Sequence, residues 1–306
     1  MKRITVLGSI NLDRTIRTSR APEAGETIHT REIFSAGGGK GANQAVAASR
    51  MNAETAFIGA IGDDEAGKLM HELLSEEKIQ LSAVKTLPGV ATGQAFVIVD
   101  DAGENRILVH GGANMALKPE DIQMVADVIK ESDCIIAQFE TPMDVIEEAF
   151  KIARQHQVMT ILNPAPATKE VPSHLLELTD VIIPNETETT ILTGISLNDE
   201  NDLSKAAHYF HNLGIKTVLI TLGSKGTYYH LANGQSNVIP AFKVEARDTT
   251  AAGDTFIGAF ASALKPDLSN IEEAIRFGNK ASSITVQRFG AQPSIPYRNE
   301  LKEDEE

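Results

Sequence analysis

Short apolar runs rich in β-branched residues alternate with segments of helical periodicity along most of the chain. The apolar runs are Ile4–Leu7, Thr55–Ile61, Cys134–Phe139, Val158–Leu162, Val181–Ile183 and Thr217–Thr221. The helical segments between them are Ala42–Met51, Glu65–Lys78, Pro119–Glu131, Met143–Gln155 and Leu203–Leu213. This alternation predicts an α/β fold in which helices cover both faces of a mostly parallel central sheet.

Two regions interrupt the alternation with strands of antiparallel type. Polar and apolar residues alternate with a period of two over Glu26–Phe34, after a stretch that contains Pro22 and Gly25. Further along, the sequence predicts a hairpin with strands Gly93–Val99 and Asn105–His110 and a turn at residues 100–103.

We interpret residues 14–35 and 91–111 as the strands of a small lid inserted into a single domain that spans residues 1–306. Because a small sheet has an apolar face to cover, the lid is expected to close on the body or to pair with a second chain, which predicts a homodimer. Residues 301–306 are expected to form a frayed acidic tail.

Net charge, cysteine content and the length of the apolar runs argue against a nucleic-acid-binding, disulfide-bonded or membrane-spanning protein. The formal net charge of −14 argues against a nucleic-acid partner, because binding to phosphate backbones needs a surplus of Lys and Arg. The single cysteine, Cys134, lies in an apolar run and has no internal partner for a disulfide. No run is long enough for a membrane helix, and the first residues lack the apolar core of a signal peptide. We therefore expect a cytoplasmic protein without a membrane partner.

The segment Asp248–Phe256 carries a strong indication of chemistry. Its small residues Ala251-Ala252-Gly253 precede Asp254 and an apolar, helix-forming run. The free backbone N–H groups at such a helix start, together with the helix dipole, form an anion site. A carboxylate beside an anion site suits a general base for phosphoryl transfer. The alternative is that Asp254 only caps the helix.

Polar groups also follow several of the other predicted strands. Asn11 and Asp13 follow the first strand and could bind vicinal hydroxyls, or else stabilise a turn. The glycine-rich segment Ala36–Gln44 lacks the Walker A and dinucleotide-binding patterns and could approach a ligand or act as a hinge. Glu140 follows the Cys134–Phe139 run.

Two later loops complete the set. Asn185 and Glu188 share one face of a predicted helix start, where they could hold Mg²⁺ through its waters or form a helix cap. The glycines of Thr221–Gly226 could approach a nucleotide or form a tight turn. Since ligands bind beyond the carboxyl ends of the strands in such sheets, all these loops are expected at one edge.

These segments resemble the ribokinase-like (PfkB-type) family of carbohydrate kinases over nearly the whole chain. The resemblance is carried by Gly38–Gln44, Asn185–Glu188, Thr221–Gly226 and Asp248–Thr255. The family motif commonly reads Gly-Ala-Gly-Asp, where this chain has Ala251–Asp254. The resemblance implies a three-layer, Rossmann-like fold with a small β-sheet lid.

The resemblance also implies roles for individual residues. The catalytic base would be Asp254, with the amides of Ala251, Ala252, Gly253 and Asp254 as the anion hole. The sugar contacts would be Asn11, Asp13, Gly39, Lys40, Gly41, Ala42, Asn43, Glu140 and Asp254. ATP would contact Asn185, Thr221, Leu222, Gly223, Ser224, Lys225, Gly226, Gly253, Asp254 and Asn279. A monovalent cation, expected to be K⁺, would lie near Asp248, Thr250, Thr285, Arg288, Gly290 and Ser294.

The implied reaction is the transfer of phosphate from ATP to the 5-hydroxyl of D-ribose. Other sugar kinases of this fold, such as a fructokinase, a 2-deoxyribose kinase or a nucleoside kinase, are alternatives. The low aromatic content of 5% favours a small polyhydroxylated sugar over a nucleoside, whose base would need a stacking partner. A silent sugar- or nucleotide-binding regulator is the alternative from a different class, although it would not need Asp254 beside an anion hole.

Overall fold

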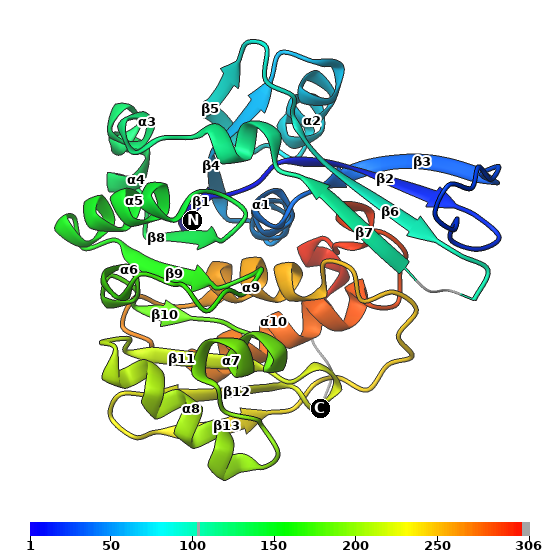
Figure 1. The fold of residues 1–306 in the computed structure, drawn as a ribbon. Helices are drawn as coiled ribbons and strands as arrows, with labels where there is room; N and C mark the ends of the chain where they lie inside the picture. Colours follow the sequence, from blue (N-terminus) through cyan, green and yellow to red (C-terminus); the bar gives the residue numbers. More distant parts are fainter. Residues whose placement is uncertain (103–104, 302–306) are drawn as a thin grey trace.

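The computed structural model describes residues 1–102 and 105–301, and a nine-stranded sheet forms its centre (Figure 1). In spatial order its strands are β13 (Ser236–Ile239), β12 (Thr227–Leu231), β11 (Thr217–Thr221), β10 (Val181–Ile182), β9 (Met159–Asn163), β8 (Cys134–Gln138), β1 (Arg3–Leu7), β4 (Glu54–Gly62) and β5 (Gln80–Leu87). From β11 along this order to β5, each strand is parallel to its neighbour. Strands β12 and β13 pair antiparallel at the other end of the sheet. The predicted mostly parallel sheet is confirmed.

Helices cover both faces of this sheet and explain its continuous apolar strands. One face packs against α1 (Lys40–Arg50), α2 (Glu65–Glu76), α9 (Ala252–Ala263) and α10 (Ile271–Thr285). The other packs against α3 (Pro119–Met124), α4 (Ala126–Lys130), α5 (Met143–Gln155), α6 (Ser173–Glu177) and α8 (Glu200–Asn212). Within β8, Ile136 faces the first set of helices and Ile135 the second. A strand buried on both faces needs apolar residues at successive positions, which is the pattern in the sequence.

A separate four-stranded sheet projects from the body as the lid (Figure 1). Its order is β3 (Glu32–Gly38), β2 (Asn11–Arg17), β6 (Gly93–Val99) and β7 (Asn105–His110). The two outer pairings are antiparallel, but the central pair of β2 and β6 is parallel. The lid and its hairpin were expected, although the predicted turn at residues 100–103 extends outside the described residues.

Several predicted element boundaries were wrong. The segment Glu26–Arg31 is not a strand, since β3 begins only at Glu32 and runs into the glycine-rich segment. Asn11 and Asp13 do not form a turn but begin β2, where they pair with Gly38 and Ala36. Strands β5 and β13, near the two ends of the large sheet, were not anticipated from the apolar runs.

The helical segment Pro119–Glu131 is divided in two. Helix α3 ends at Met124 and α4 begins at Ala126, with Val125 between them at φ −112° and ψ 18°. In the described part of the chain, the remaining elements are α7 (Glu186–Thr193) and four short 3₁₀ helices: η1 (Gly112–Ala116), η2 (Gly223–Lys225), η3 (Gln292–Ser294) and η4 (Arg298–Glu300). Among the described residues, no helix has the length and apolar character needed to cross a bilayer.

Candidate active site

The carboxyl ends of the parallel strands face the base of the lid and bring the predicted polar residues together. Asn11 follows β1, Glu140 follows β8, and Asn185 follows β10. Helix α9 begins at the same edge with Ala252, Gly253 and Asp254 in its first turn. The expected convergence of loops from distant parts of the sequence is therefore present in the fold.

Asp254 is buried at the start of α9, with only 8% of its surface exposed. The Asn43 amide donates to Asp254 Oδ2 at 3.0 Å, and the Gln44 amide donates to Asp254 Oδ1 at 2.9 Å. Both donors come from α1, which packs against α9. The carboxylate is thus fixed by side chains from another helix, and it caps no N–H of its own helix.

The first turn of α9 presents free backbone donors. Ala251 precedes the helix with φ 60°, and the Ala252 N–H donates to the Thr249 carbonyl at 3.2 Å. Within the described part of the chain, the N–H groups of Gly253 and Asp254 have no hydrogen-bond partner. Two unpaired N–H groups at the positive end of a 12-residue helix form a suitable anion site.

Asp13 projects from β2 into the same region, and the pKa of its carboxyl is strongly raised. Burial, together with the negative charges of Glu140 and Asp254, raises the pKa of its carboxyl to about 7. No described residue donates a hydrogen bond to this carboxylate. A partly buried carboxylate without donors is costly for the folded protein, and hydroxyl groups of a ligand would supply the missing donors.

Asn11 is buried beside Asp13 and is held by a residue that the sequence did not reveal. Asn11 Oδ1 accepts a hydrogen bond from the Asn114 amide at 2.8 Å, and Asn114 also bonds both backbone groups of Ile10. The Asn11 N–H₂ group has no partner in the described residues and remains a donor. Asn114 comes from η1, which follows the lid strand β7, so it links the lid to the pocket.

Glu140 closes the other side of the pocket through contacts with the glycine-rich segment. Its carboxylate accepts from the Ser9 hydroxyl and from the Lys40 backbone N–H, the latter at 3.2 Å. Gly39, the residue before α1, has φ 92°, a conformation that favours glycine. A Cβ on Gly41 would lie 2.7 Å from the backbone of Gly8. The glycines therefore allow close packing of α1 on the β1 end, and the hinge alternative finds no support in this buried packing.

Lys40 and Asn43 complete the pocket with groups that lack partners. Burial by itself would lower the pKa of Lys40, but the carboxylates of Asp254, Glu140 and Glu188 outweigh it and raise that pKa. The ammonium group therefore stays charged. Asn43 Oδ1 is buried and accepts no hydrogen bond from any described residue. An orphaned acceptor of this kind indicates a place for a ligand donor.

Two adjoining cavities lie on either side of the α9 start. The first, of about 190 Å³, includes Lys40, Glu188 and Asp254 in its lining. The second, of about 320 Å³, includes Gly223, Gly226 and Asn279. Asn185, Thr221, Ala252 and Gly253 line both cavities. The anion site therefore lies at the junction of the two cavities, whereas Asn11 and Asp13 lie outside both linings.

The expected nucleotide loop takes the form of a tight turn between β11 and β12. Gly223–Lys225 form η2, and the Leu222 N–H donates to the Gly226 carbonyl at 2.8 Å. The Leu222 side chain is buried in the core, so only its backbone can meet a ligand. The Asn279 side chain is fully engaged, since it accepts from Thr227 at 2.9 Å and donates to the carbonyls of Ile239 and Pro240 at 3.1 and 3.2 Å.

Asn185 and Glu188 form a capping box at the start of α7. Glu188 N donates to Asn185 Oδ1 at 2.8 Å, and Asn185 N donates to Glu188 Oε2 at 2.9 Å. Burial raises the pKa of Glu188, although the Asn185 hydrogen bond and Lys40 act against this effect. The capping alternative is thus present in the fold, and the same carboxylate lines the cavity beside Asp254, where an oxygen-ligated Mg²⁺ would fit.

The residues expected around a monovalent cation are partly connected. Asp248 Oδ1 accepts from the backbone and hydroxyl of Thr250 at 2.9 and 2.6 Å, and Asp248 Oδ2 accepts from the Gly290 N–H at 2.9 Å. Burial opposes ionisation of Asp248, but these hydrogen bonds prevail and lower its pKa. The two loops are thereby joined by an ionised carboxylate, and this fits a cation that is bound mainly by oxygen atoms.

The other three expected cation residues differ in what they can offer. Ser294 is buried and donates to the Ala291 carbonyl at 2.7 Å. The Thr285 hydroxyl donates to Thr255 of α9 at 3.0 Å. The Arg288 side chain pairs with Glu300. Arg288 can therefore contribute only its backbone carbonyl to such a site.

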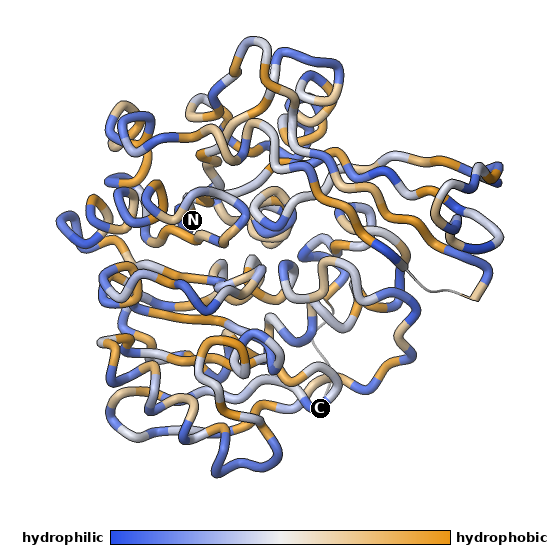
Figure 2. The backbone as a smooth tube through the Cα atoms, viewed as in Figure 1, coloured by the Kyte–Doolittle hydropathy of each residue, from blue (hydrophilic) through white to orange (hydrophobic). Residues whose placement is uncertain are grey.

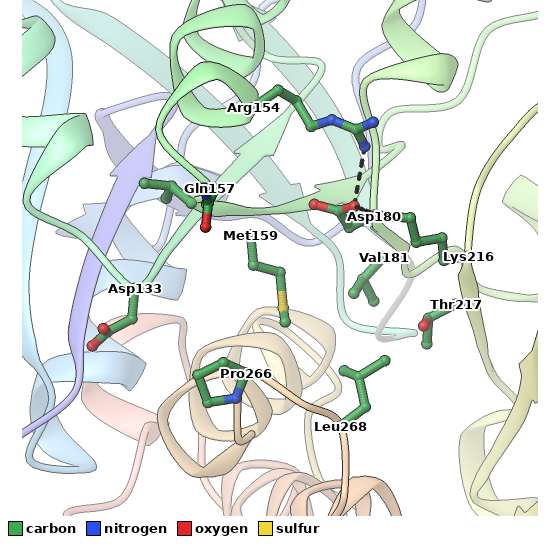
Figure 3. Close-up of a pocket in the computed structure, with 11 residues that line it drawn as sticks. Asp133, Arg154, Gln157, Met159, Asp180, Val181, Lys216, Thr217, Pro266 and Leu268 are labelled. Atoms are coloured by element: carbon green, nitrogen blue, oxygen red, sulfur yellow. Dashed lines mark hydrogen bonds and ion pairs between the residues drawn. The ribbon is translucent and has the colours of Figure 1, made fainter.

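A different hollow, of about 380 Å³, lies at the opposite edge, around the amino ends of β8 to β11 (Figure 3). Asp180 accepts there from Arg154 at 3.1 Å and from Lys216 at 3.0 Å. Met159, Leu268 and other apolar side chains form much of the lining. None of the predicted site residues lies in this hollow, and its Arg154 and Lys216 charges are already paired with Asp180.

Comparison with known proteins agrees with the geometry. The profile of the pfkB family carbohydrate kinases matches residues 1–298. The chain belongs to this family. It is therefore a carbohydrate kinase, which transfers a phosphoryl group to an alcohol.

Within this family, the chain is similar in sequence or structure to the following three proteins. A ribokinase of Staphylococcus aureus (strain COL) is 49% identical over 98% of this chain and 99% of its own length. The structure of Arabidopsis thaliana ribokinase complexed with ribose and ATP aligns with a TM-score of 0.93 at 34% identity, covering 98% of this chain and 97% of that one. A deoxyribokinase of Salmonella typhi is 33% identical over 98% of this chain and 97% of its own length.

The sequence alone did not reveal the residues that hydrogen-bond the expected site residues and hold them in place. Gln44 stands in the glycine-rich motif but was given no role, and it proves to bond the base. The Ser282 hydroxyl of α10 donates to the Ala252 carbonyl at 3.0 Å and so holds the α9 start. Ser9 and Asn114 act in the same way on Glu140 and Asn11. Motif spacing could have suggested Gln44, but no local signal connects Asn114 with a residue 103 positions away.

Proposed function

We propose that this chain transfers the γ-phosphoryl group of ATP to the 5-hydroxyl of D-ribose. One observation carries the proposal: Asp254, at the N-terminus of α9, is hydrogen-bonded to Asn43 and lies near Asp13, and it lines a cavity that shares Thr221 and Gly253 with the cavity beside the Gly223–Lys225 turn. A base placed between a sugar pocket and an anion site meets the geometric requirement for phosphoryl transfer to an alcohol.

Ribose would bind through groups whose hydrogen-bonding capacity the protein leaves unused. The Asp13 carboxylate accepts from sugar hydroxyls, while the Asn11 N–H₂ donates to one of them. Asn43 Oδ1 and Glu140 add acceptors, and the backbone of residues 39–42 forms the wall of the pocket. Such a set selects a small polyol, because each polar group left without a sugar hydroxyl would be desolvated without compensation.

Asp254 would then accept the proton of the 5-hydroxyl as the oxygen attacks the γ-phosphorus in line. The N–H groups of Gly253 and Asp254 and the α9 dipole stabilise the charge that develops on the transferred group. Lys40, which stays charged, offers a further positive group in the same cavity. The lid excludes water, which would otherwise compete with the sugar as nucleophile.

ATP would bind along the second cavity, against residues 221–226 and beside Asn279. Asn185 and Glu188 would hold a Mg²⁺ ion through its waters, and that ion supplies charge neutralisation at the phosphates. Asp248 with the carbonyl groups of its own loop and of residues 285–294 would hold a K⁺ ion. The role of the chain's own residues there is to fix the loop that leads into Ala251 and Ala252, since Asp248 binds Thr250 and Gly290 at once.

The test is a coupled assay of ADP release with a panel of acceptors. D-ribose should give the highest kcat/KM, and 2-deoxy-D-ribose, D-fructose and adenosine should each give lower values. A higher value for 2-deoxy-D-ribose would replace the proposed substrate with that of the deoxyribokinase relative. A high value for adenosine would indicate a nucleoside kinase.

We further propose that the lid sheets of two chains pair to form a homodimer. The large apolar side chains Ile33, Phe34, Ile107, Leu108 and Val109 lie on the lid edge strands, and each is between 41% and 63% exposed. Figure 2 shows the hydrophobic stretches along the lid strands. A patch of this kind on a small sheet is typical of an interface. Because ATP is an intracellular substrate, the reaction is expected in the cytoplasm.

A further inference from the structure

A network of three buried amides lies behind the base and connects it to two strand ends. Gln44 Nε2 lies 2.9 Å from Asp254 Oδ1 and 3.2 Å from Asn163 Oδ1. Gln138 Nε2 donates to Gln44 Oε1 at 2.6 Å. Gln44 and Gln138 are fully buried, and Asn163 is 6% exposed. The network thus joins α1, the end of β8 and the end of β9 to the start of α9.

The direction of every hydrogen bond in this network follows from its two ends. An ionised Asp254 only accepts, so Gln44 must present its N–H₂ group to it. The Asn163 amide donates to the Ile183 carbonyl at 3.0 Å, which leaves Asn163 Oδ1 to accept the second Gln44 proton. Gln44 Oε1 is then an acceptor for Gln138. A single arrangement of the amides satisfies all four contacts, so the network fixes the place and the orientation of the Asp254 carboxylate.

The network also carries a cost that simple core packing would not. Gln138 Oε1 is buried and has no hydrogen-bond partner among the residues that the structure describes. Apolar side chains of similar volume could fill the same space without this desolvation. The buried amides are explained if they serve to hold the Asp254 carboxylate through Gln44, and not to stabilise the core.

We infer that Gln44 is a positioning residue for the base: it holds the Asp254 carboxylate in one orientation relative to the sugar hydroxyl. This inference rests on the proposed reaction, in which Asp254 takes the proton. Gln44 and Asn43 occupy one lone pair on each carboxylate oxygen, so the remaining lone pairs can receive the proton only in directions set by α1. The other charged groups around Asp254 are Asp13, Lys40 and Glu188.

Two substitutions separate the role of Gln44 from that of its bulk. Gln44→Glu keeps the shape but places a second carboxylate against Asp254, and Gln44→Met keeps the volume but removes the amide. We expect kcat to fall by about 10²-fold in both, with KM for ribose and ATP within about threefold of the wild type. In Gln44→Glu the acidic limb of the kcat–pH profile should also move to higher pH, because a neighbouring carboxylate favours the protonated base.

Gln155→Glu is the matched control, since it makes the same change at an exposed position of α5. It should retain wild-type kcat and pH profile. Thermal melting of each variant identifies loss of fold. Should Gln44→Glu melt below the assay temperature, the inference is tested with Gln44→Met alone. Wild-type kcat in folded Gln44→Met would overturn the inference, as would wild-type kcat with an unmoved pH profile in folded Gln44→Glu. An inactive wild type would instead overturn the proposed function, so the two failures are distinguishable.

Discussion

Asp13 should lower the stability of the sugar-free protein at neutral and alkaline pH, and Asp13→Asn should relieve this effect. The carboxylate is partly buried, it lies near Glu140 and Asp254, and its pKa is raised from 3.8 to about 7. Asparagine has nearly the same shape and no charge to desolvate. Replacement should therefore stabilise the fold while it removes the acceptor that the proposed ribose site needs.

The size and sign of the effect follow from proton linkage. Between pH 3.8 and pH 7 the folded protein holds the Asp13 proton and the unfolded chain releases it, so this group makes the fold less stable as pH rises through that window. The difference of roughly three pKa units corresponds to about 4 kcal/mol at most. Asp13→Asn should recover much of this at pH 8, which amounts to a rise in Tm on the order of 5 °C. At pH 4 the two proteins should differ little.

The assay is urea unfolding of the wild type and Asp13→Asn at pH 4, 6 and 8, without sugar. The free energy of unfolding of the variant minus that of the wild type should increase from pH 4 to pH 8. Asp144→Asn, at an exposed carboxylate in the first turn of α5, controls for loss of a negative charge. A difference that does not change with pH, or a variant less stable than the wild type at pH 8, would refute the reasoning. It would indicate that Asp13 stabilises local structure instead.

Three other predictions address the remaining parts of the site. Asp254→Asn should keep ATP affinity and fold but lose about 10²-fold or more in kcat, and retention of a tenth of wild-type kcat would exclude it as the base. Activity should rise when K⁺ is added to a Tris-buffered assay at constant ionic strength; an equal rise with tetramethylammonium would remove the case for a cation site at Asp248. Light scattering should give a dimer, whereas Leu108→Lys in the lid should shift the mass toward the 32.9 kDa monomer; a wild type that is monomeric at micromolar concentration would exclude lid pairing.

The layered fold could be predicted because its information is local. A strand such as β8 is buried on both faces and must be apolar throughout, whereas α5 shows helical periodicity, and its predicted bounds agree with the structure. The edge strand β5 was missed because half of its residues are polar and exposed. The lid boundary was wrong because β3 ends in glycines, which are rare in strands but are required here beside Asp13 and the start of α1.

The site could be predicted only as far as single loops reveal it. Asp254, Asn11 and Glu140 follow strands or begin a helix, so topology alone places them at one edge. The supporting bonds from Gln44 to Asp254 and from Asn114 to Asn11 join residues more than 100 positions apart. They depend on how α1 packs on α9 and on where the chain re-enters the body after β7. Sequence periodicity contains neither kind of information.

The central claim is tested most directly by following the phosphoryl group. The protein is incubated with ATP, Mg²⁺ and D-ribose labelled with ¹³C at C5, and the products are observed by ³¹P and ¹³C NMR. The proposed function predicts ADP together with a phosphate ester at C5 of ribose, formed in step with each other and about 10²-fold or more slowly with Asp254→Asn. Formation of ADP and free phosphate without an ester, or an ester at another carbon, would contradict it.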